Sequence, residues 1–440
     1  MFVFYLYAGI LLGILIIVHE VGHFLAARAA RVTVERFSIG FGPKILAVRR
    51  GETEYALSAF PLGGYVKMAG MEPAGEEGGP PGPNTFLGKP IGVRALIVAA
   101  GPATNLVWAI ILYIAVIWAA GIPVIGEEAV VGYIYEGSPA ESAGLAIEDR
   151  IVSVEGNAVD TWDGVRELIA SGDAADGIAL VVERGEVPEV VEILVDVTPD
   201  PETGAITIGI GPYIAPVLGD IKRGSPAERA GLATGDRVLR IGDAETRTWY
   251  QFEEIVSGSA GQELEVVWER DGRVERGAVV VEETMEAVSA TEVRPVGTIG
   301  ALAPLTMRKV GFGEALTTGF GLSITNVRLV WEFFLGLARG RVSADMLGGP
   351  IRVVQLASES AAWGASYFFA FMAFLSLNLF VINAFPLPIL DGGHLLLLAL
   401  EKVRGRGLTE RQLLVWQQIG LIFFVGLLAF LLVRDAISLA

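Results

Sequence analysis

Four stretches of the chain are almost continuously apolar. They cover residues 4–27, 94–120, 365–388 and 413–433. A helix needs about 20 residues to cross a hydrocarbon core of about 30 Å, so each stretch is long enough to span a membrane. The first stretch has no basic leader and no obvious cleavage site, and we interpret it as a retained span. The pattern predicts a multi-pass α-helical membrane protein with four transmembrane helices.

Between the second and third apolar stretches the pattern changes to short alternating segments, and it occurs twice. The string GSPAESAGLAIEDR from Gly137 matches GSPAERAGLATGDR from Gly224. Alternating apolar residues such as Val152 and Val154 indicate strands that follow a short Ala-rich helix. We therefore expect two copies of one α+β domain. The repeated strings resemble bacterial PDZ domains, which bind extended peptides at a sheet edge; spacers that merely block access to the membrane part are the alternative.

Two further segments have weaker patterns. The strings ILAV and YALSAF lie on either side of a turn at Arg50 and favour strands, which predicts a membrane-associated β-hairpin after the first span. Its edge could pair with an unwound peptide, and an ordinary connecting loop is the alternative. Residues 311–345 have the pattern of amphipathic helices, with Trp331 and Phe334 among their aromatic residues, and predict a surface-lying link. A helix of a soluble domain is the alternative there.

These patterns divide the chain into five predicted parts. The parts are a first transmembrane pair with a cytoplasmic-side hairpin loop (1–120), PDZ domain 1 (121–208), PDZ domain 2 (209–290), a linker with amphipathic helices (291–364) and a second transmembrane pair (365–440).

Composition supports a chain that lies partly in the lipid bilayer. Of its 440 residues 52% are hydrophobic, more than an ordinary soluble domain carries. Positive residues concentrate after the first span and between the third and fourth, so we expect these loops on the cytoplasmic side and the PDZ-like repeat on the opposite side of the membrane. The repeat region is acidic and accounts for the net charge of −17, which argues against nucleic acid as a partner. The chain contains no cysteine, so any metal site must use histidine and carboxylates.

The candidate chemistry begins with His19-Glu20-Val21-Gly22-His23, an HExxH motif inside the first span. Residues four apart on a helix share a face, so both imidazoles can bind one Zn²⁺ while Glu20 stays free to act on water. Ionisable groups inside a span are costly unless they are paired or liganded. This cost favours a metal site over a merely hydrogen-bonded pair.

A second motif contains the remaining histidine of the chain. His394 ends the string NAFPLPILDGGH, which also contains Asp391. A catalytic zinc usually has three protein ligands and a water, so this motif is expected to supply the third ligand. The residues alone leave both Asp391 and His394 as candidates. Pro386 and Pro388 break the span before them and free backbone groups that a polar cavity can satisfy.

The motifs together resemble one known family over nearly the whole chain. HEVGH, FPLGGYVKMAG, GPATN, the tandem repeat and NAFPLPILDGGH are similar to the site-2 protease family, in its RseP-like bacterial branch (regulator of sigma-E protease). The resemblance implies an intramembrane zinc metalloprotease of the bacterial inner membrane. It implies one Zn²⁺ held by His19, His23 and Asp391, with Glu20 as the catalytic base. His394 would then lie behind the ligands or at a helix start.

The resemblance also implies how a substrate is handled. The hairpin would hold the substrate extended, with Gly63, Gly64 and Tyr65 in contact with it. Asn383 and Asn378 would grip its backbone, although for Asn383 simple hydrogen bonding between helices is an equal alternative. The implied substrates are a single-pass anti-sigma factor already trimmed on its outer side and remnant signal peptides. The PDZ pair would act as a size filter against untrimmed protein.

The residues Gly101 and Asn105 of GPATN are expected to serve close packing between helices.

Two functions of other classes fit parts of the sequence. A membrane-anchored PDZ scaffold without catalysis would explain the repeat and the spans, but not the complete HExxH. A metal-ion transporter would explain histidine and aspartate inside the membrane. It would not need Glu20 between two ligands, and four spans leave little room for paired transport repeats. We therefore expect proteolysis of membrane proteins.

Overall fold

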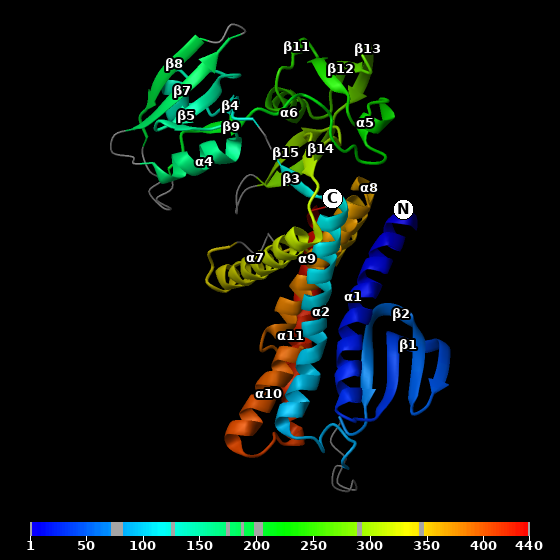
Figure 1. The fold of residues 1–440 in the computed structure, drawn as a ribbon. Helices are drawn as coiled ribbons and strands as arrows, with labels where there is room; N and C mark the ends of the chain where they lie inside the picture. The colour runs from blue at the N-terminus through cyan, green and yellow to red at the C-terminus, as the bar shows by residue number, and fades with distance from the viewer. Residues whose placement is uncertain are drawn as a thin grey trace. The chain divides into compact units, whose positions relative to one another are not determined.

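The computed structural model describes residues 2–71, 82–124, 128–172, 177–185, 189–197, 206–287, 293–342 and 347–438. The chain forms two compact units, and Figure 1 shows the elements of each. The first unit combines Met1–Gly121 with Val310–Ala440, and the second comprises Ile122–Lys309. The internal boundaries predicted between residues 121 and 364 stay predictions.

Long apolar helices build the first unit. They and their shorter neighbours are α1 (Phe2–Ala29), α2 (Ile91–Ala120), α7 (Phe312–Ala338), α8 (Pro350–Trp363), α9 (Ala365–Ala384), α10 (Asp391–Arg404) and α11 (Glu410–Ser438). Within the described residues, α1, α2, α7, α9 and α11 contain segments long and apolar enough to cross a membrane. The prediction of a multi-pass helical membrane protein is confirmed.

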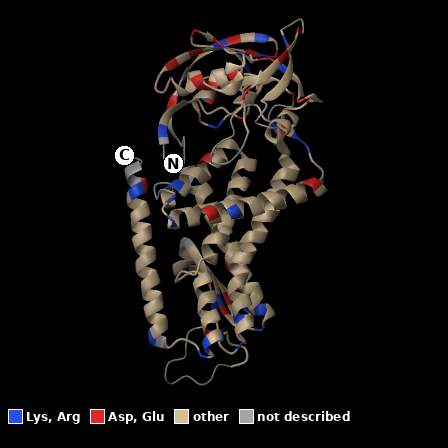
Figure 2. Cartoon of the chain, turned by 90° about the vertical axis from the view of Figure 1, so that its left-hand side faces the viewer, with Lys and Arg blue, Asp and Glu red and all other residues tan. Residues whose placement is uncertain are grey.

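Helix α7 is the one of these five helices that was not predicted as a span. It runs across α2 and α9 in both views rather than alongside them (Figures 1 and 2). It packs closely on α2, because a Cβ added at Gly319 would lie 2.8 Å from the Ile114 side chain. Its position is compatible with the surface-lying link predicted for residues 311–345.

Helix α2 lies at the centre of the first unit and packs against α1, α7, α9 and α10. The fully buried side chains between these helices include Leu11 and Leu15 of α1 and Met372 and Leu377 of α9. Because lipid is as apolar as these side chains, the helices are held together by tight packing and by hydrogen bonds rather than by exclusion of water. One such bond runs from the Ser376 hydroxyl to the Asn105 carbonyl, 2.8 Å apart.

The hairpin predicted after the first span is present, and it is longer than the two strings that indicated it. Strands β1 (Val34–Arg50) and β2 (Thr53–Met68) are both bent. The first half of β1 pairs on one side with the end of β2 and on the other with its beginning, as Phe37 does with Val66 and Tyr55. Two chain segments therefore make a four-stranded antiparallel sheet. The end of β2, around Gly64, forms one edge of this sheet and packs along α1 (Figure 1).

The second unit holds the two predicted copies. In the first copy a four-stranded sheet has the order β6 (Asn157–Ala158), β5 (Arg150–Val154), β7 (Ile178–Arg184), β8 (Glu189–Val195), with helices α3 (Pro139–Ser142) and α4 (Trp162–Ser171). In the second copy the order is β11 (Ala244–Glu245), β10 (Arg237–Ile241), β12 (Glu263–Arg270), β13 (Arg273–Val280), with helices α5 (Pro226–Arg229) and α6 (Trp249–Ser257). The equal strand order confirms the repeat and its α+β character.

Shorter pairings complete the unit. Strand β4 (Val131–Ile134) pairs with β9 (Ile210–Pro212), β14 (Glu282–Ala287) with β15 (Val293–Thr298), and β16 (Thr306–Arg308) with β3 (Ile122–Val124). All three pairs are antiparallel.

An ion pair between a buried aspartate and a partly exposed arginine occurs at the same place in both copies. Asp149 in the first copy binds the guanidinium of Arg184 through both carboxylate oxygens, at 2.6 and 2.5 Å. Asp236 and Arg270 repeat this contact in the second copy, both at 2.6 Å. Each aspartate also accepts a backbone N–H three residues before it. The GDR and EDR strings therefore tie the turn after the short helix to the sheet.

Candidate metal centre

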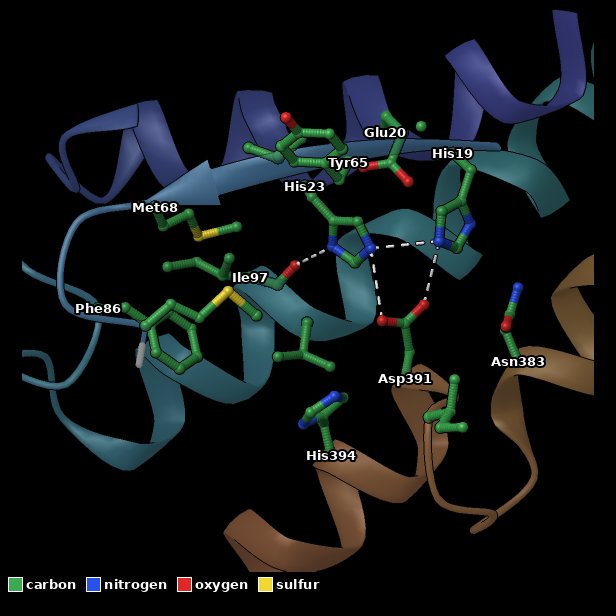
Figure 3. Close-up of a pocket in the computed structure, with 15 residues that line it drawn as sticks. His19, Glu20, His23, Tyr65, Met68, Phe86, Ile97, Asn383, Asp391 and His394 are labelled. Atoms are coloured by element: carbon green, nitrogen blue, oxygen red, sulfur yellow. Dashed lines mark hydrogen bonds and ion pairs between the residues drawn. The ribbon is translucent and has the colours of Figure 1, made fainter. Parts of the chain in front are cut away.

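Helix α1 carries both histidines of the HExxH motif on one face. Its positions four residues apart lie one above the other, which brings the Nε2 atoms of His19 and His23 within 3.2 Å. The third group comes from a segment almost 370 residues later, where α10 begins at Asp391. Its carboxylate oxygens lie 3.1 Å from His19 Nε2 and 3.4 Å from His23 Nε2 (Figure 3). Three donor atoms from two helices thus converge on one point.

The spacing of these donors fits a bound metal ion. Zinc binds histidine nitrogen and carboxylate oxygen at about 2.0–2.2 Å, so neighbouring ligands in a tetrahedral site lie about 3.3–3.6 Å apart. Without a shared cation, Asp391 could accept hydrogen bonds from both imidazoles only if two N–H groups were crowded against each other, because the two Nε2 atoms lie 3.2 Å apart. A cation removes this conflict, because all three atoms then present lone pairs to it. Among the described residues, His19, His23 and Asp391 are the group found to be close enough to hold a metal ion.

The second motif's two candidates have different surroundings. The carboxylate oxygens of Asp391 lie within 3.1 and 3.4 Å of the two histidine Nε2 atoms. Burial lowers the pKa of His394, which keeps that imidazole neutral. His394 lines the same pocket but lies one turn further along α10, and in Figure 3 no interaction joins it to the cluster. The geometry thus selects Asp391 where the residues alone had left two choices.

Both histidines are oriented by α2. The Nδ1 atom of His23 lies 2.9 Å from the Ile97 carbonyl, which can only accept, so this nitrogen carries the proton and Nε2 is free for a metal. His19 Nδ1 lies 3.2 Å from the side-chain nitrogen of Asn105, a fully buried residue whose amide oxygen has no partner. A half-turn of this amide presents the oxygen to Nδ1–H and satisfies both groups. With its proton on Nδ1, His19 has a lone pair on Nε2, and this nitrogen is then free to bind a metal.

Two glycines allow α1 and α2 to approach this closely. A Cβ added at Gly101 of α2 would lie 2.6 Å from Cε1 of His23 and 2.8 Å from its Cδ2. A Cβ added at Gly22 of α1 would lie 2.8 Å from the carbonyl carbon of Ala100. Real Cβ atoms essentially never come within 3.0 Å of such neighbours. The expected packing role of Gly101 is thus a direct contact with the imidazole that the metal needs.

Glu20 lies beside the donor cluster but is not part of it. Its side chain packs against the edge of β2, where a Cβ added at Gly64 would lie 3.1 Å from Glu20 Cγ. Val66, on the same strand, lines the pocket beside Glu20. The strand thus holds the carboxylate near the cluster while leaving it outside the ligand set.

A pocket of about 300 Å³ opens onto the cluster. Its walls come from α1, β2, α2, the end of α9 and the start of α10, and they include Gly64, Tyr65 and Asn383, three of the five residues predicted to contact substrate. The other two expected substrate residues lie elsewhere. Gly63 packs against the Phe41 ring in a left-handed backbone conformation, at φ +140°. Asn378 donates its side-chain N–H to the Phe374 carbonyl, 2.8 Å away, within its own helix.

Helix α10 is held at its start by backbone packing and at its end by one ion pair. Helix α9 ends at Ala384, before Pro386 and Pro388, so the span predicted to reach residue 388 is shorter at this end. Gly393 in the first turn of α10 packs on Pro388, with an added Cβ 3.3 Å from its Cα. In the last turn, Glu401 binds the buried Arg94 of α2 through both oxygens, at 2.5 and 3.1 Å. Both ends of α10 are therefore fixed against α2 and the turn before it.

Comparison with known proteins supplies the family. The model of the family described as "Peptidase family M50" matches residues 7–427. The chain belongs to peptidase family M50. "Regulator of sigma-E protease RseP" of Salmonella typhimurium is 34% identical over 444 residues, covering 97% of this chain and 96% of that protein. The Escherichia coli protein of the same name is 34% identical over 443 residues, covering 96% of both.

Two further comparisons concern a relative from another bacterium and a solved domain structure. A relative from Pasteurella multocida, described as a zinc metalloprotease, is 34% identical over 442 residues and 98% of both chains. A solved PDZ domain of an SdrC-like protein from Listeria monocytogenes is 22% identical, at a TM-score of 0.17, and covers 20% of this chain and 90% of that domain. The M50 membership confirms a multi-pass membrane zinc metalloprotease that is homologous to RseP.

Some residues around the candidate metal centre were not predicted from the sequence. Asn105 was assigned to packing, although a polar residue in a span is itself a signal for a partner inside the membrane. The contact of Ile97 with His23 comes from a backbone atom, for which side-chain identity gives no signal. Arg94 offered a signal, because an arginine at the start of an apolar helix needs a partner, but the sequence does not name Glu401.

Proposed function

We propose that this protein cuts single-pass membrane proteins within or at the edge of the bilayer, with His19, His23 and Asp391 holding one Zn²⁺ and Glu20 as the catalytic base. The observation that carries the proposal is the Asp391 carboxylate, 3.1 and 3.4 Å from two histidine nitrogens on another helix, with a free glutamate beside them. A glutamate between the two histidines serves hydrolysis and has no use in a site that only stores a metal.

The roles of the residues follow from their placement. Zinc, when bound, supplies the Lewis acidity that activates a water molecule and polarises the scissile carbonyl. The Glu20 carboxylate takes a proton from the attacking water and hands it to the leaving amine. The packing of the Glu20 side chain against Gly64 keeps its carboxylate at the wall of the pocket. The products are two peptides, one with a new carboxylate and one with a new amine.

Substrate is proposed to bind along the edge of β2. The end of β2, around Gly64 and Tyr65, pairs with β1 on one side only, and these two residues line the pocket. A sheet edge offers unpaired N–H and C=O groups, so an unwound substrate segment can add to it as a further strand. Asn383 lies on the opposite wall and can hydrogen-bond the substrate backbone from there. For Gly63 and Asn378, which do not line the pocket, contact with substrate stays a prediction.

The substrate class and the topology are proposals that rest on homology and charge. The relatives are regulators of sigma-E, so the proposed substrate is an anti-sigma factor already trimmed on its outer side, with remnant signal peptides as a second class. The PDZ pair is proposed to exclude untrimmed protein. The positive charge of the loops beside the two motifs supports a cluster near the cytoplasmic side of the inner membrane, and the PDZ domains are proposed to lie in the periplasm.

Zinc content and cleavage, measured on the same samples, test the core of the proposal. We expect about one Zn²⁺ per chain in the native protein. The Glu20→Gln variant is expected to keep the metal and lose cleavage of a transmembrane substrate, and Asp391→Ala to lose both. His394→Ala is the matched control, because it removes a pocket histidine outside the cluster and should keep the zinc. Retention of zinc and turnover in Asp391→Ala would refute the assignment.

The filter role needs its own experiment. One transmembrane substrate is compared with and without a bulky outer domain, using the native protein and a variant that lacks residues 122–309. The native protein should prefer the trimmed form, and the deletion should cut both forms equally well. If the deletion variant keeps the preference, the filter lies elsewhere in the protein.

A further inference from the structure

A second pocket lies at the end of α1, apart from the metal centre. Its volume is about 670 Å³, within the range of ligand-binding pockets. Its walls come from three separate segments: the end of α1, the turn between β1 and β2, and the chain just before α2. Hydrogen bonds from Thr53 Oγ1 to the Val34 carbonyl, 2.8 Å, and from Thr33 N–H to the Asn84 carbonyl, 2.9 Å, hold these segments together. The pocket is therefore a defined site rather than a gap between loops.

Three arginines line this pocket. They are Arg28 and Arg31 after the first span and Arg50 at the hairpin turn. Among the described residues none of them forms an ion pair, and Arg28 has only a contact of its guanidinium with the Phe24 ring, 5.7 Å from the centroid. One acidic residue, Glu52, lines the same pocket, so two positive charges remain in excess. A guanidinium group can bind two phosphate oxygens at once, so three arginines on the walls of one pocket favour a phosphate group as its ligand.

The backbone at Arg31 is unusual. Its φ of +57° lies in the left-handed region, where glycine or asparagine is the ordinary choice at the end of a helix. An arginine there costs backbone strain that glycine would avoid. A strained backbone at a residue with a long charged side chain points to a binding role for that side chain.

The position of the pocket in the membrane indicates which phosphate-containing molecule could bind there. The apolar segment of α1 ends at Ala29, so Arg28 and Arg31 lie where the hydrocarbon core meets the headgroups. Tyr55, which also lines the pocket, is a residue type enriched at this depth. The ligand that is present at this depth at high concentration is a phospholipid headgroup.

We propose that Arg28, Arg31 and Arg50 bind the phosphate of one anionic phospholipid, of the phosphatidylglycerol class. The excess of positive charge selects an anionic lipid over one whose headgroup carries a cation. Glu52 can accept a hydrogen bond from a headgroup hydroxyl, which glycerol provides and choline does not. A bound lipid would join the end of α1 to the hairpin turn, so the sheet that packs against Glu20 would be braced from its outer end. Binding itself does not depend on proteolysis.

The test measures binding of short-chain lipids to the full-length protein in a neutral detergent by calorimetry. Short-chain phosphatidylglycerol is the probe, and short-chain phosphatidylcholine and inorganic phosphate are the two comparisons. Each arginine near a membrane phosphate contributes about a fivefold gain in affinity, so Arg28→Gln and Arg50→Gln should each weaken phosphatidylglycerol about fivefold. The triple variant with Arg31→Gly should lose roughly a hundredfold.

Two controls keep the result interpretable. The matched triple variant Arg49→Gln, Arg404→Gln and Arg406→Gln removes the same charge outside the pocket, and it should bind as the native protein does. Arg31→Gly alone relieves the left-handed backbone, so it should unfold at the same or a higher temperature while binding about fivefold more weakly. A loss of affinity in that variant cannot then be ascribed to misfolding.

Hydrogen exchange of the protein in vesicles provides a second measurement. Vesicles containing phosphatidylglycerol should slow exchange at residues 31–34 and 50–55 relative to pure phosphatidylcholine vesicles, and the triple pocket variant should show no difference. Equal affinity for inorganic phosphate and phosphatidylglycerol would overturn the lipid assignment. Native affinity in the triple pocket variant, or an equal loss in the matched triple, would overturn the site.

Discussion

Replacing Gly101 by alanine should remove zinc from the protein without unfolding it. Gly101 lies on α2 opposite the imidazole of His23, and a methyl group there would lie 2.6 Å from Cε1 and 2.8 Å from Cδ2. Carbon atoms in contact prefer about 3.5–4.0 Å, so the ring must move by about 1 Å. A zinc–nitrogen bond tolerates about 0.2 Å. The imidazole therefore cannot keep both its place beside the methyl group and its bond to the metal.

The size of the effect follows from the number of ligands. Disturbing a residue that only orients a ligand typically costs 10- to 100-fold in metal affinity. Displacing one of three ligands should cost at least the upper end of that range, so about 100-fold or more is expected for Gly101→Ala. The measurement is zinc content after dialysis against a series of chelator concentrations, with cleavage and thermal unfolding recorded on the same samples.

Gly92→Ala is the matched control for this experiment. Gly92 lies on the same helix, and a Cβ added there meets nothing within 4 Å. Alanine is the better helix former, so this variant should be at least as stable and should bind zinc normally. If Gly101→Ala binds zinc as tightly as Gly92→Ala and cleaves at the native rate, the contact between α1 and α2 described above is wrong.

Three other changes test separate parts of the structure. Asn105→Leu should weaken zinc binding about 10- to 100-fold, measured by chelator competition, because His19 loses the partner of its Nδ1. Asp149→Ala should destabilise the first copy of the repeated domain by about 2–3 kcal/mol, seen as faster hydrogen exchange there and not in the second copy. This is less than the full cost of breaking a buried pair because Arg184 is 39% exposed. Hydrogen bonds from a lysine and an arginine hold the pKa of Glu54 below its ordinary value, so its contribution to the hairpin is present above the ordinary pKa and is lost as the pH falls through the lowered one. Exchange in the hairpin should therefore rise with acid in the native protein, and Glu54→Gln should remove that pH dependence.

The sequence by itself determined the features that depend on neighbours along the chain. Spans are runs of about 20 apolar residues, the histidine pair follows from the helical period, and the repeat is visible as matching strings. These patterns predicted His19, Glu20 and His23 as one site, together with two α+β copies. They also predicted a turn at Arg50, and the structure has β1 and β2 meeting there.

Only the tertiary structure decided what depends on contacts between distant segments. Asp391 and His394 lie three residues apart, and their selection required the place where α10 meets α1. The partner of His19, the folding of two bent strands into a four-stranded sheet and the path of α7 across the bundle are likewise set by packing between distant elements. The physical reason is that a local pattern reports which face of a helix or strand is apolar, whereas the neighbour of that face is chosen by the shape of the whole unit.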